Sequence, residues 1–147
     1  QHGPAVGIIE LPALGQRVFA GRGLGCTVVD FHGERPARVS DTSAIGDALL
    51  CTSGFGSWSP EQVQAAHSSG ALLRTWGDGY GYALVATGEA DAMVDPVVAY
   101  DLAPMPVILA EAGGRFTALD GHEGADRGHG LATNGHIHDQ VIDLLHR

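Results

Sequence analysis

Short runs of apolar and β-branched residues recur along the first third of the chain, separated by glycine, proline and charged positions. The strands that this pattern predicts are residues 5–11, 16–20, 26–31 and 37–40. Strands that follow one another at roughly 8–12-residue intervals, with turn residues between them, are typical of an antiparallel arrangement. We therefore predict an antiparallel meander before residue 41.

The pattern changes after residue 46, where short apolar runs alternate with segments of helical periodicity. The predicted strands are residues 47–52, 71–76, 92–95, 115–119 and 131–133, and the predicted helices are residues 60–70, 79–88, 102–112 and 138–146. Such alternation is typical of an α/β layer. The expected fold class is α/β, with antiparallel strands over residues 1–45 and a C-terminal α/β subdomain over residues 46–147.

Charge excludes two classes of partner. The chain carries 17 acidic side chains against 8 basic ones, all of them arginine, and its net charge is −9. A basic face for nucleic acid cannot be assembled from this composition, and neither can a polybasic membrane anchor. The apolar runs are also far shorter than a bilayer span. We expect neither nucleic acid nor a membrane as partner.

The two cysteines and the first residues bear on the compartment. Cys26 and Cys51 are too few for a disulfide scaffold, and the opening residues do not resemble a secretory leader. We interpret both cysteines as buried free thiols, which are typical of a cytoplasmic protein.

Three other motifs are interpreted as structural. A β-branched strand follows the glycines of residues 21–25, so we predict a hairpin turn there rather than a phosphate-binding loop. Ser53 is disfavoured as a nucleophile because no G-x-S-x-G motif surrounds it. His136 and His138 are disfavoured as metal ligands because positions i and i+2 of a helix point to different sides, and we expect both on the surface.

Three aspartates are the candidate functional residues. Asp101 lies where an extended segment meets the predicted helix 102–112. It suits a helix N-cap, which needs no other reason for an aspartate, and it also suits a carboxylate ligand of a hard cation such as Mg²⁺. Asp95 and Asp78 lie at the ends of predicted strands, where they could face a shared cleft. Each of these two also suits an ordinary turn.

The segment around these aspartates resembles the C-terminal signature of the inositol monophosphatase superfamily of Mg²⁺-dependent phosphatases. That signature begins with W-D-x-A at a helix start, continues with aliphatic residues and ends with E-A-G-G. Residues 100–103 (YDLA) and 111–114 (EAGG) are similar to its two ends, and residues 74–82 are most similar to the bacterial histidinol-phosphatase branch. The chain departs from the pattern at Tyr100, and at Pro104 and Pro106, which crowd the predicted helix; Pro106 removes a backbone donor.

The resemblance implies an activity and a role for each aspartate. The activity is the Mg²⁺-dependent hydrolysis of a small phosphorylated metabolite, with L-histidinol phosphate as the expected substrate. Asp101 would be a metal ligand, whereas Asp95 and Asp78 would contact the polar end of the substrate. Two alternatives stay open, namely an inositol phosphate as substrate, and a non-catalytic module that only folds, dimerises or binds a ligand.

The resemblance also implies that part of the catalytic machinery lies outside these residues. Members of the superfamily carry an acidic ligand and a D-P-x-D-G motif in their N-terminal half, and the present sequence contains no such motif. We therefore expect the chain to correspond to the C-terminal half, with residues 1–45 belonging to an incomplete central sheet. By itself it should be inactive. We also expect the protein to form a homodimer.

Overall fold

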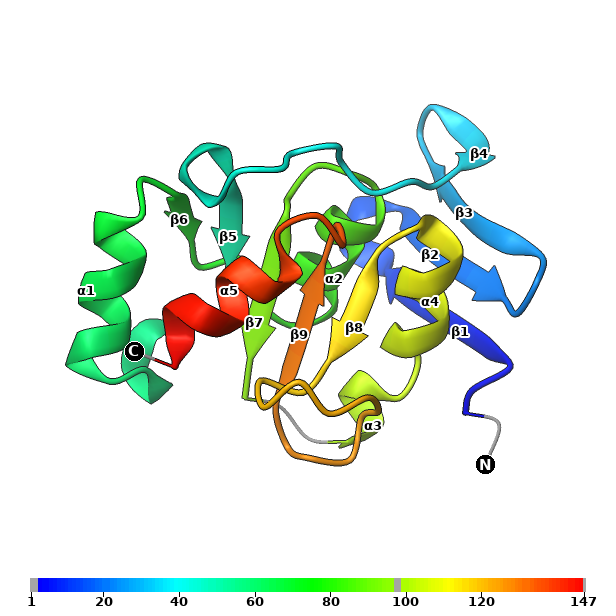
Figure 1. Cartoon of the computed structure of the whole chain (residues 1–147). Coiled ribbons are helices and arrows are strands. Elements are labelled where there is room, and N and C mark those ends of the chain that lie inside the picture. Colours follow the sequence, from blue (N-terminus) through cyan, green and yellow to red (C-terminus); the bar gives the residue numbers. More distant parts are fainter. Residues whose placement is uncertain (1–2, 97–98, 147) are drawn as a thin grey trace.

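The computed structural model describes residues 3–96 and 99–146, which form two sheets and the helices packed on them (Figure 1). The strands are β1 (Val6–Leu11), β2 (Gln16–Gly21), β3 (Gly25–Asp30), β4 (Gly33–Pro36), β5 (Leu49–Cys51), β6 (Leu72–Arg74), β7 (Ala92–Asp95), β8 (Arg115–Thr117) and β9 (Gly130–Thr133). The helices are α1 (Pro60–Ser68), α2 (Asp78–Ala86), α3 (Ala99–Leu102), α4 (Met105–Ala112) and α5 (His138–Leu145). The predicted α/β class is confirmed.

The first sheet is the predicted antiparallel meander. Its order is β1-β2-β3-β4, and each strand pairs antiparallel with the next. The glycines of residues 21–25 close the β2–β3 hairpin, where the Leu24 amide donates to the Gly21 carbonyl at 2.8 Å. Gly23 has a φ of +74°, a conformation that glycine adopts without a steric penalty. The interpretation of this motif as a hairpin turn is confirmed.

The fourth strand differs from its prediction. It covers residues 33–36 rather than 37–40, because Asp30 pairs directly with Gly33 across a tight turn. The following segment then leaves the sheet, since the Val39 amide donates to the Ala112 carbonyl at the end of α4, at 3.1 Å. Residues 37–40 therefore connect the first sheet to the helical layer.

The second sheet is mixed. Its order is β6-β5-β7-β9-β8, with β6, β5 and β7 parallel to one another and β9 antiparallel to both β7 and β8. The predicted alternation of strands and helices after residue 46 is confirmed. Because neighbouring parallel strands run in the same direction, the carboxyl ends of β6, β5 and β7 lie at one edge of the sheet.

Two helical layers cover the second sheet. Helices α2 and α4 lie between the sheets, where Ile108 of α4 belongs to the same core as Val18 of β2 and Met93 of β7 (Figure 1). Helices α1 and α5 cover the opposite face, where Val141 joins Val94 in a second core. Met93 and Val94 serve different cores because successive residues of a strand point to opposite faces.

The helix predicted over residues 102–112 is wrong as a single element. The chain forms α3 and then α4, with Pro104 at the N-cap of α4 and Pro106 in its first turn. Neither proline has a backbone N–H, so a continuous helix through these positions would lose hydrogen bonds. Asp101 lies inside α3, and its interpretation as the cap of the longer helix is therefore wrong.

The burial of the two cysteines confirms its prediction, whereas the burial of His138 corrects the predicted surface position. Cys26 and Cys51 are buried free thiols, as predicted, and burial raises the pKa of each to about 11. His138 is 1% exposed rather than on the surface, because its two ring nitrogens lie 3.0 Å from Thr117 Oγ1 and 2.8 Å from Thr133 Oγ1. The ring thus joins α5 to strands β8 and β9.

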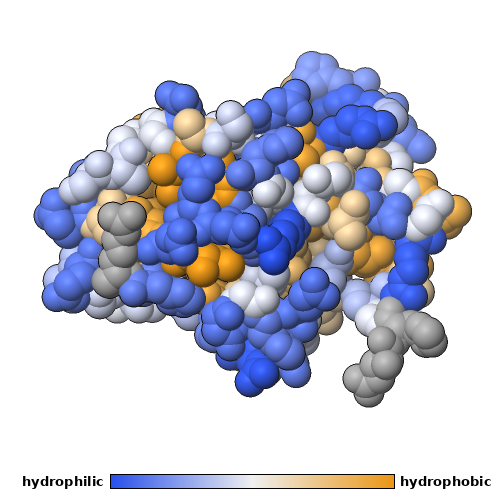
Figure 2. All heavy atoms as spheres, viewed as in Figure 1, coloured by the Kyte–Doolittle hydropathy of each residue, from blue (hydrophilic) through white to orange (hydrophobic). Residues whose placement is uncertain are grey.

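The outer face of the first sheet has apolar side chains without a covering layer in the described part of the chain. Val6 is 64% exposed and Ile8 is 55% exposed, and both lie on the face of β1 that points away from α2 and α4. Figure 2 shows apolar residues reaching the surface in the region of this sheet. Among the described residues, no helix combines the length and apolar character that crossing a membrane requires.

Candidate functional site

Polar side chains gather at the carboxyl ends of the three parallel strands. Ser53 lies two residues beyond β5, Asp95 is the last residue of β7, and Asp78 begins α2 after β6. In open α/β sheets, ligands bind at this edge of the strands. The strand order β6-β5-β7 places Ser53 between the two aspartates.

Ser53 contacts both aspartates. Asp95 is fully buried, and one of its carboxylate oxygens accepts a hydrogen bond from the Ser53 amide at 3.1 Å while the other accepts one from the Ser53 hydroxyl. The same hydroxyl oxygen accepts a hydrogen bond from the Asp78 amide at 3.2 Å and lies 3.4 Å from Asp78 Oδ1. Ser53 therefore fixes the ends of all three strands relative to one another.

The backbone before Asp78 is shaped for this contact. A Cβ atom on Gly77 would lie 2.1 Å from Ser53 Oγ and 2.5 Å from Ser53 Cα, so only glycine fits there. Asp78 itself has a φ of +50°, in the left-handed region that residues other than glycine adopt infrequently. Strained backbone of this kind concentrates at functional sites, where the surrounding contacts hold it in place.

Asp78 and Asp101 line one cavity of about 200 Å³. The remaining residues that line it come from β1, from α2 and from the segment around α3 and α4: Ile8, Ile9, Gly79, Tyr82, Tyr100, Pro104 and Met105. Asp95 is joined to this cavity through Ser53 and Asp78. The structure thus brings Asp78 and Asp101 to one cavity and ties Asp95 to Asp78. Strand β7, which Asp95 ends, and helix α3, which contains Asp101, meet at the bottom of Figure 1.

Tyr82 adds an uncharged polar group to this site. Its side chain is 1% exposed, and its hydroxyl has no hydrogen-bond partner within residues 3–96 and 99–146. Burial raises the pKa of this phenol, and the negative charges of Asp95, Asp101 and Asp78 raise it further. The hydroxyl therefore keeps its proton at neutral pH.

The described residues do not assemble a metal site by themselves. Among them, no three histidine, cysteine or acidic side chains lie together in an arrangement that could hold a metal ion. Asp101 offers a single carboxylate, and Mg²⁺ gives up its waters reluctantly, so that holding it also requires substrate phosphate oxygens, which this chain does not supply. The expected Mg²⁺ ion therefore does not fit this chain's residues alone.

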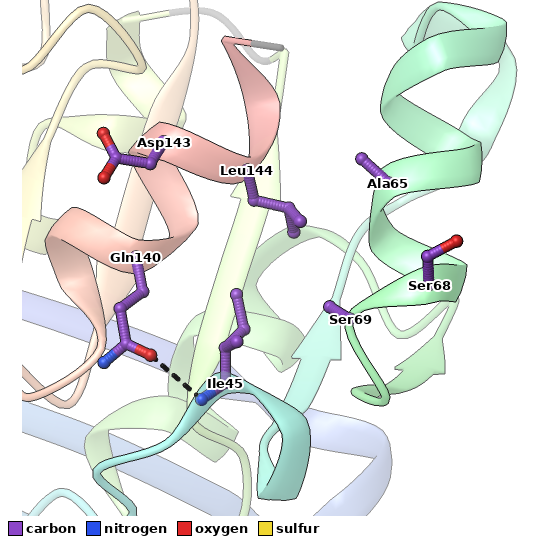
Figure 3. Close-up of a pocket in the computed structure, with 7 residues that line it drawn as sticks. All are labelled: Ile45, Ala65, Ser68, Ser69, Gln140, Asp143 and Leu144. Carbon is purple, nitrogen blue, oxygen red and sulfur yellow. Dashed lines mark hydrogen bonds between the residues drawn. The ribbon is translucent and has the colours of Figure 1, made fainter.

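A larger cavity, of about 350 Å³, lies between α1 and α5 (Figure 3). Its walls include Ala65, Ser68 and Leu144, and the Gln140 side chain at its rim accepts a hydrogen bond from the Ile45 amide at 3.1 Å. Its one carboxylate, Asp143, has no second acidic group beside it among the residues that line this cavity. We therefore regard the smaller cavity, with its two carboxylates, as the candidate functional site.

Sequence reasoning did not assign Ser53 or Tyr82 to the site. The signal for Ser53 was its place directly after a buried strand, but its contact with Asp95 depends on β5 and β7 being neighbours in the sheet. Tyr82 lies in a run of α2, residues 81–86, that is buried throughout, and burial alone does not distinguish a packed ring from an unpaired hydroxyl. Both residues became visible only through the three-dimensional arrangement.

Comparisons with known proteins show which family and which fold the chain resembles. The model of the inositol monophosphatase family matches residues 1–147. The histidinol-phosphatase of Mycobacterium tuberculosis is 37% identical over 97% of this chain and 57% of its own length, and that of Streptomyces coelicolor is 32% identical over 98% and 56%. The crystal structure of the suhB protein from Bartonella henselae superposes with a TM-score of 0.84 at 23% identity, covering 100% of this chain and 61% of that one.

The chain thus spans just over half the length of the curated relatives that it matches. Its two sheets and their helices align with the C-terminal part of solved inositol monophosphatase structures. From the family match over the whole sequence, together with this fold, we conclude that the chain belongs to the inositol monophosphatase family of metal-dependent phosphomonoesterases.

Proposed function

We propose that the complete protein hydrolyses a small phosphomonoester in the presence of Mg²⁺, and that its substrate is L-histidinol phosphate. The observation that carries this proposal is the meeting of Asp78 and Asp101 at one cavity, with the buried Asp95 tied to Asp78 through Ser53. The similarity to two bacterial histidinol-phosphatases supports the choice of substrate.

The charges at the site suit the organic part of that substrate. L-Histidinol phosphate carries an amine and an imidazole at the end remote from its phosphate. Asp78 is exposed and lines the cavity, where it can accept hydrogen bonds from such groups, and the buried Asp95 is tied to it through Ser53. We assign Asp78 and Asp95 to this polar end of the substrate.

We assign Asp101 to the metal. It is an exposed carboxylate on α3 that lines the same cavity. Since the described residues do not form a metal site alone, the other ligands would come from the part of the relatives' length that this chain does not span. The chain of 147 residues should then be inactive by itself and should bind Mg²⁺ weakly.

The test is a comparison of the chain with a complete enzyme. The chain is assayed alone and as a fusion to the unmatched part of the M. tuberculosis relative, with L-histidinol phosphate and inositol 1-phosphate as substrates, with Mg²⁺ or EDTA. We expect turnover of L-histidinol phosphate only by the fusion and only with Mg²⁺. A preference for inositol 1-phosphate would show that the substrate is an inositol phosphate and not L-histidinol phosphate. A folded but inactive fusion would support the alternative of a non-catalytic module.

A further inference from the structure

The hydroxyl of Tyr82 is a buried hydrogen-bonding group without a partner among residues 3–96 and 99–146. The side chain is 1% exposed, and its oxygen has no partner in the described part of the chain. A hydroxyl withdrawn from water without a new hydrogen bond destabilises the folded state. Because buried polar groups in native proteins nearly always have partners, an unpaired one calls for a reason.

The hydroxyl lies where the elements of the candidate site converge. Its oxygen is 3.0 Å from the position that a Cβ on Gly130 would take, and Leu102 of α3 borders the same position. Gly130 is the residue of β9 that pairs with Asp95. Tyr82 also lines the cavity that Asp78 and Asp101 share. The unused group therefore belongs to the functional end of the sheet.

The hydroxyl differs chemically from the charged groups around it. The carboxylates of Asp78 and Asp101 accept hydrogen bonds and, when ionised, donate none, whereas the protonated phenol of Tyr82 offers a proton. A ligand group that pairs with both a carboxylate and the phenol must donate one hydrogen bond and accept another. A neutral imidazole and an alcohol hydroxyl each do so, but an ammonium group only donates.

We propose that the Tyr82 hydroxyl binds the acceptor atom of a neutral, two-way hydrogen-bonding group of the ligand, an imidazole nitrogen or an alcohol oxygen, and so determines specificity. The proposal rests on the proposed function, because it names how that same site recognises the organic part of the substrate. Without a ligand the hydroxyl has no partner among the residues that the structure describes. The ligand then supplies its missing hydrogen bond.

The test removes this one oxygen and measures stability and binding separately. Tyr82→Phe and the matched control Tyr80→Phe, which loses a hydroxyl from the same helix outside the cavity, are compared with the wild-type chain. Each is melted without ligand and then titrated with L-histidinol, myo-inositol and n-propylammonium, using ¹H–¹⁵N NMR shifts of residues 78–82. The first two probes separate an imidazole from an alcohol as the group recognised.

We expect Tyr82→Phe to melt at the same or a higher temperature than wild type, because it removes an unpaired polar atom. It should bind L-histidinol or myo-inositol at least tenfold more weakly, while its affinity for n-propylammonium stays unchanged. Tyr80→Phe should bind all three probes like wild type. The Cζ shift of ¹³C-labelled Tyr82 should move on ligand binding, as it does when a phenol gains a hydrogen bond.

Three results would overturn the inference. These are a lower melting temperature for Tyr82→Phe, equal affinity of this variant and wild type for both organic probes, and no binding of either probe to the wild-type chain. The fusion enzyme separates the two proposals. If the Tyr82→Phe fusion turns over L-histidinol phosphate with an unchanged KM, the role of Tyr82 is refuted and the phosphatase function stands. If probe binding depends on Tyr82 but the fusion shows no turnover, the phosphatase function is refuted and the role of Tyr82 stands.

Discussion

Ser53 holds the carboxylate of Asp95 with two hydrogen bonds, one from its backbone amide and one from its hydroxyl, although 42 positions separate them along the chain. Asp95 is fully buried at the end of β7, where its charge needs hydrogen-bond donors to replace water. The pair therefore fixes the edge of the sheet at which Asp78 also lies.

The first prediction concerns this pair. Ser53→Ala keeps the amide donor but removes the hydroxyl, so the buried Asp95 carboxylate loses one of its two donors. We expect the free energy of unfolding to fall by about 1–3 kcal/mol, as it does when a buried partner is left unsatisfied. Urea denaturation of the chain measures it, with the exposed Ser57→Ala as control. Equal stability of both variants would show that the hydroxyl contributes nothing to holding Asp95.

Gly77 should not tolerate a side chain. In Gly77→Ala the new Cβ would lie 2.1 Å from Ser53 Oγ, and both strand ends would have to shift. Overpacking of this kind typically costs about 1–3 kcal/mol of stability. Gly56→Ala is the control, because a Cβ there meets no atom within 4 Å. Thermal melting of both variants checks the difference, and similar melting temperatures would contradict the close approach of Gly77 to Ser53.

Asp101 and Asp120 should differ strongly in the fusion enzyme. Asp101→Asn keeps the shape but removes the charge that a hard cation requires, so we expect a loss of at least ~100-fold in rate, about 2.7 kcal/mol. Asp120 accepts a hydrogen bond from the His122 amide in a turn, and Asp120→Asn should retain most of the activity. Both variants are assayed across a Mg²⁺ titration.

The stability of the Asp101 variant separates a metal role from a structural one. Asp101 is exposed and lies inside the short α3, so Asp101→Asn should hardly change the melting temperature without metal. Near-normal activity of Asp101→Asn at every Mg²⁺ concentration would refute its role as a metal ligand. A large drop in melting temperature would instead point to an effect on folding.

Acid should destabilise the protein through His138. Burial lowers the pKa of its ring to about 4, with a further lowering by the charge of Arg115 and a smaller opposing effect of Asp139. In the unfolded chain the ring takes up a proton near pH 6.5. The contribution of the neutral ring is therefore complete above about pH 6.5 and is lost as the pH falls toward 4.

Unfolding free energies measured between pH 4 and 8 check this expectation. His138→Gln removes the ionisable ring, so the fall in stability between pH 6.5 and 4 should be smaller than in wild type. His136→Gln, at an exposed position two residues earlier, should retain the wild-type slope. An identical slope in all three proteins would exclude His138 as the source of the acid sensitivity.

The local sequence pattern was sufficient to predict much of the architecture. The meander, the alternation after residue 46 and the burial of Cys26 and Cys51 follow from hydrophobic periodicity and turn residues, which act over a few neighbouring positions. The same kind of reasoning singled out Asp78, Asp95 and Asp101 as polar residues at the ends of elements. The resemblance of the surrounding segment to a family signature then suggested metal and substrate binding as their roles, which spacing alone left open.

Only the tertiary structure decided which of these residues meet. Ser53 contacts Asp95 because β5 and β7 are neighbours, and a strand order is a choice among distant pairings that no local window contains. The break between α3 and α4 depends on two closely spaced prolines together with packing. Because of this break, Asp101 lies inside a short helix and not at the start of the longer predicted one. The burial of His138 and the unpaired Tyr82 hydroxyl likewise depend on side chains brought together from distant segments, because a hydrogen bond is made or missed in space rather than along the chain.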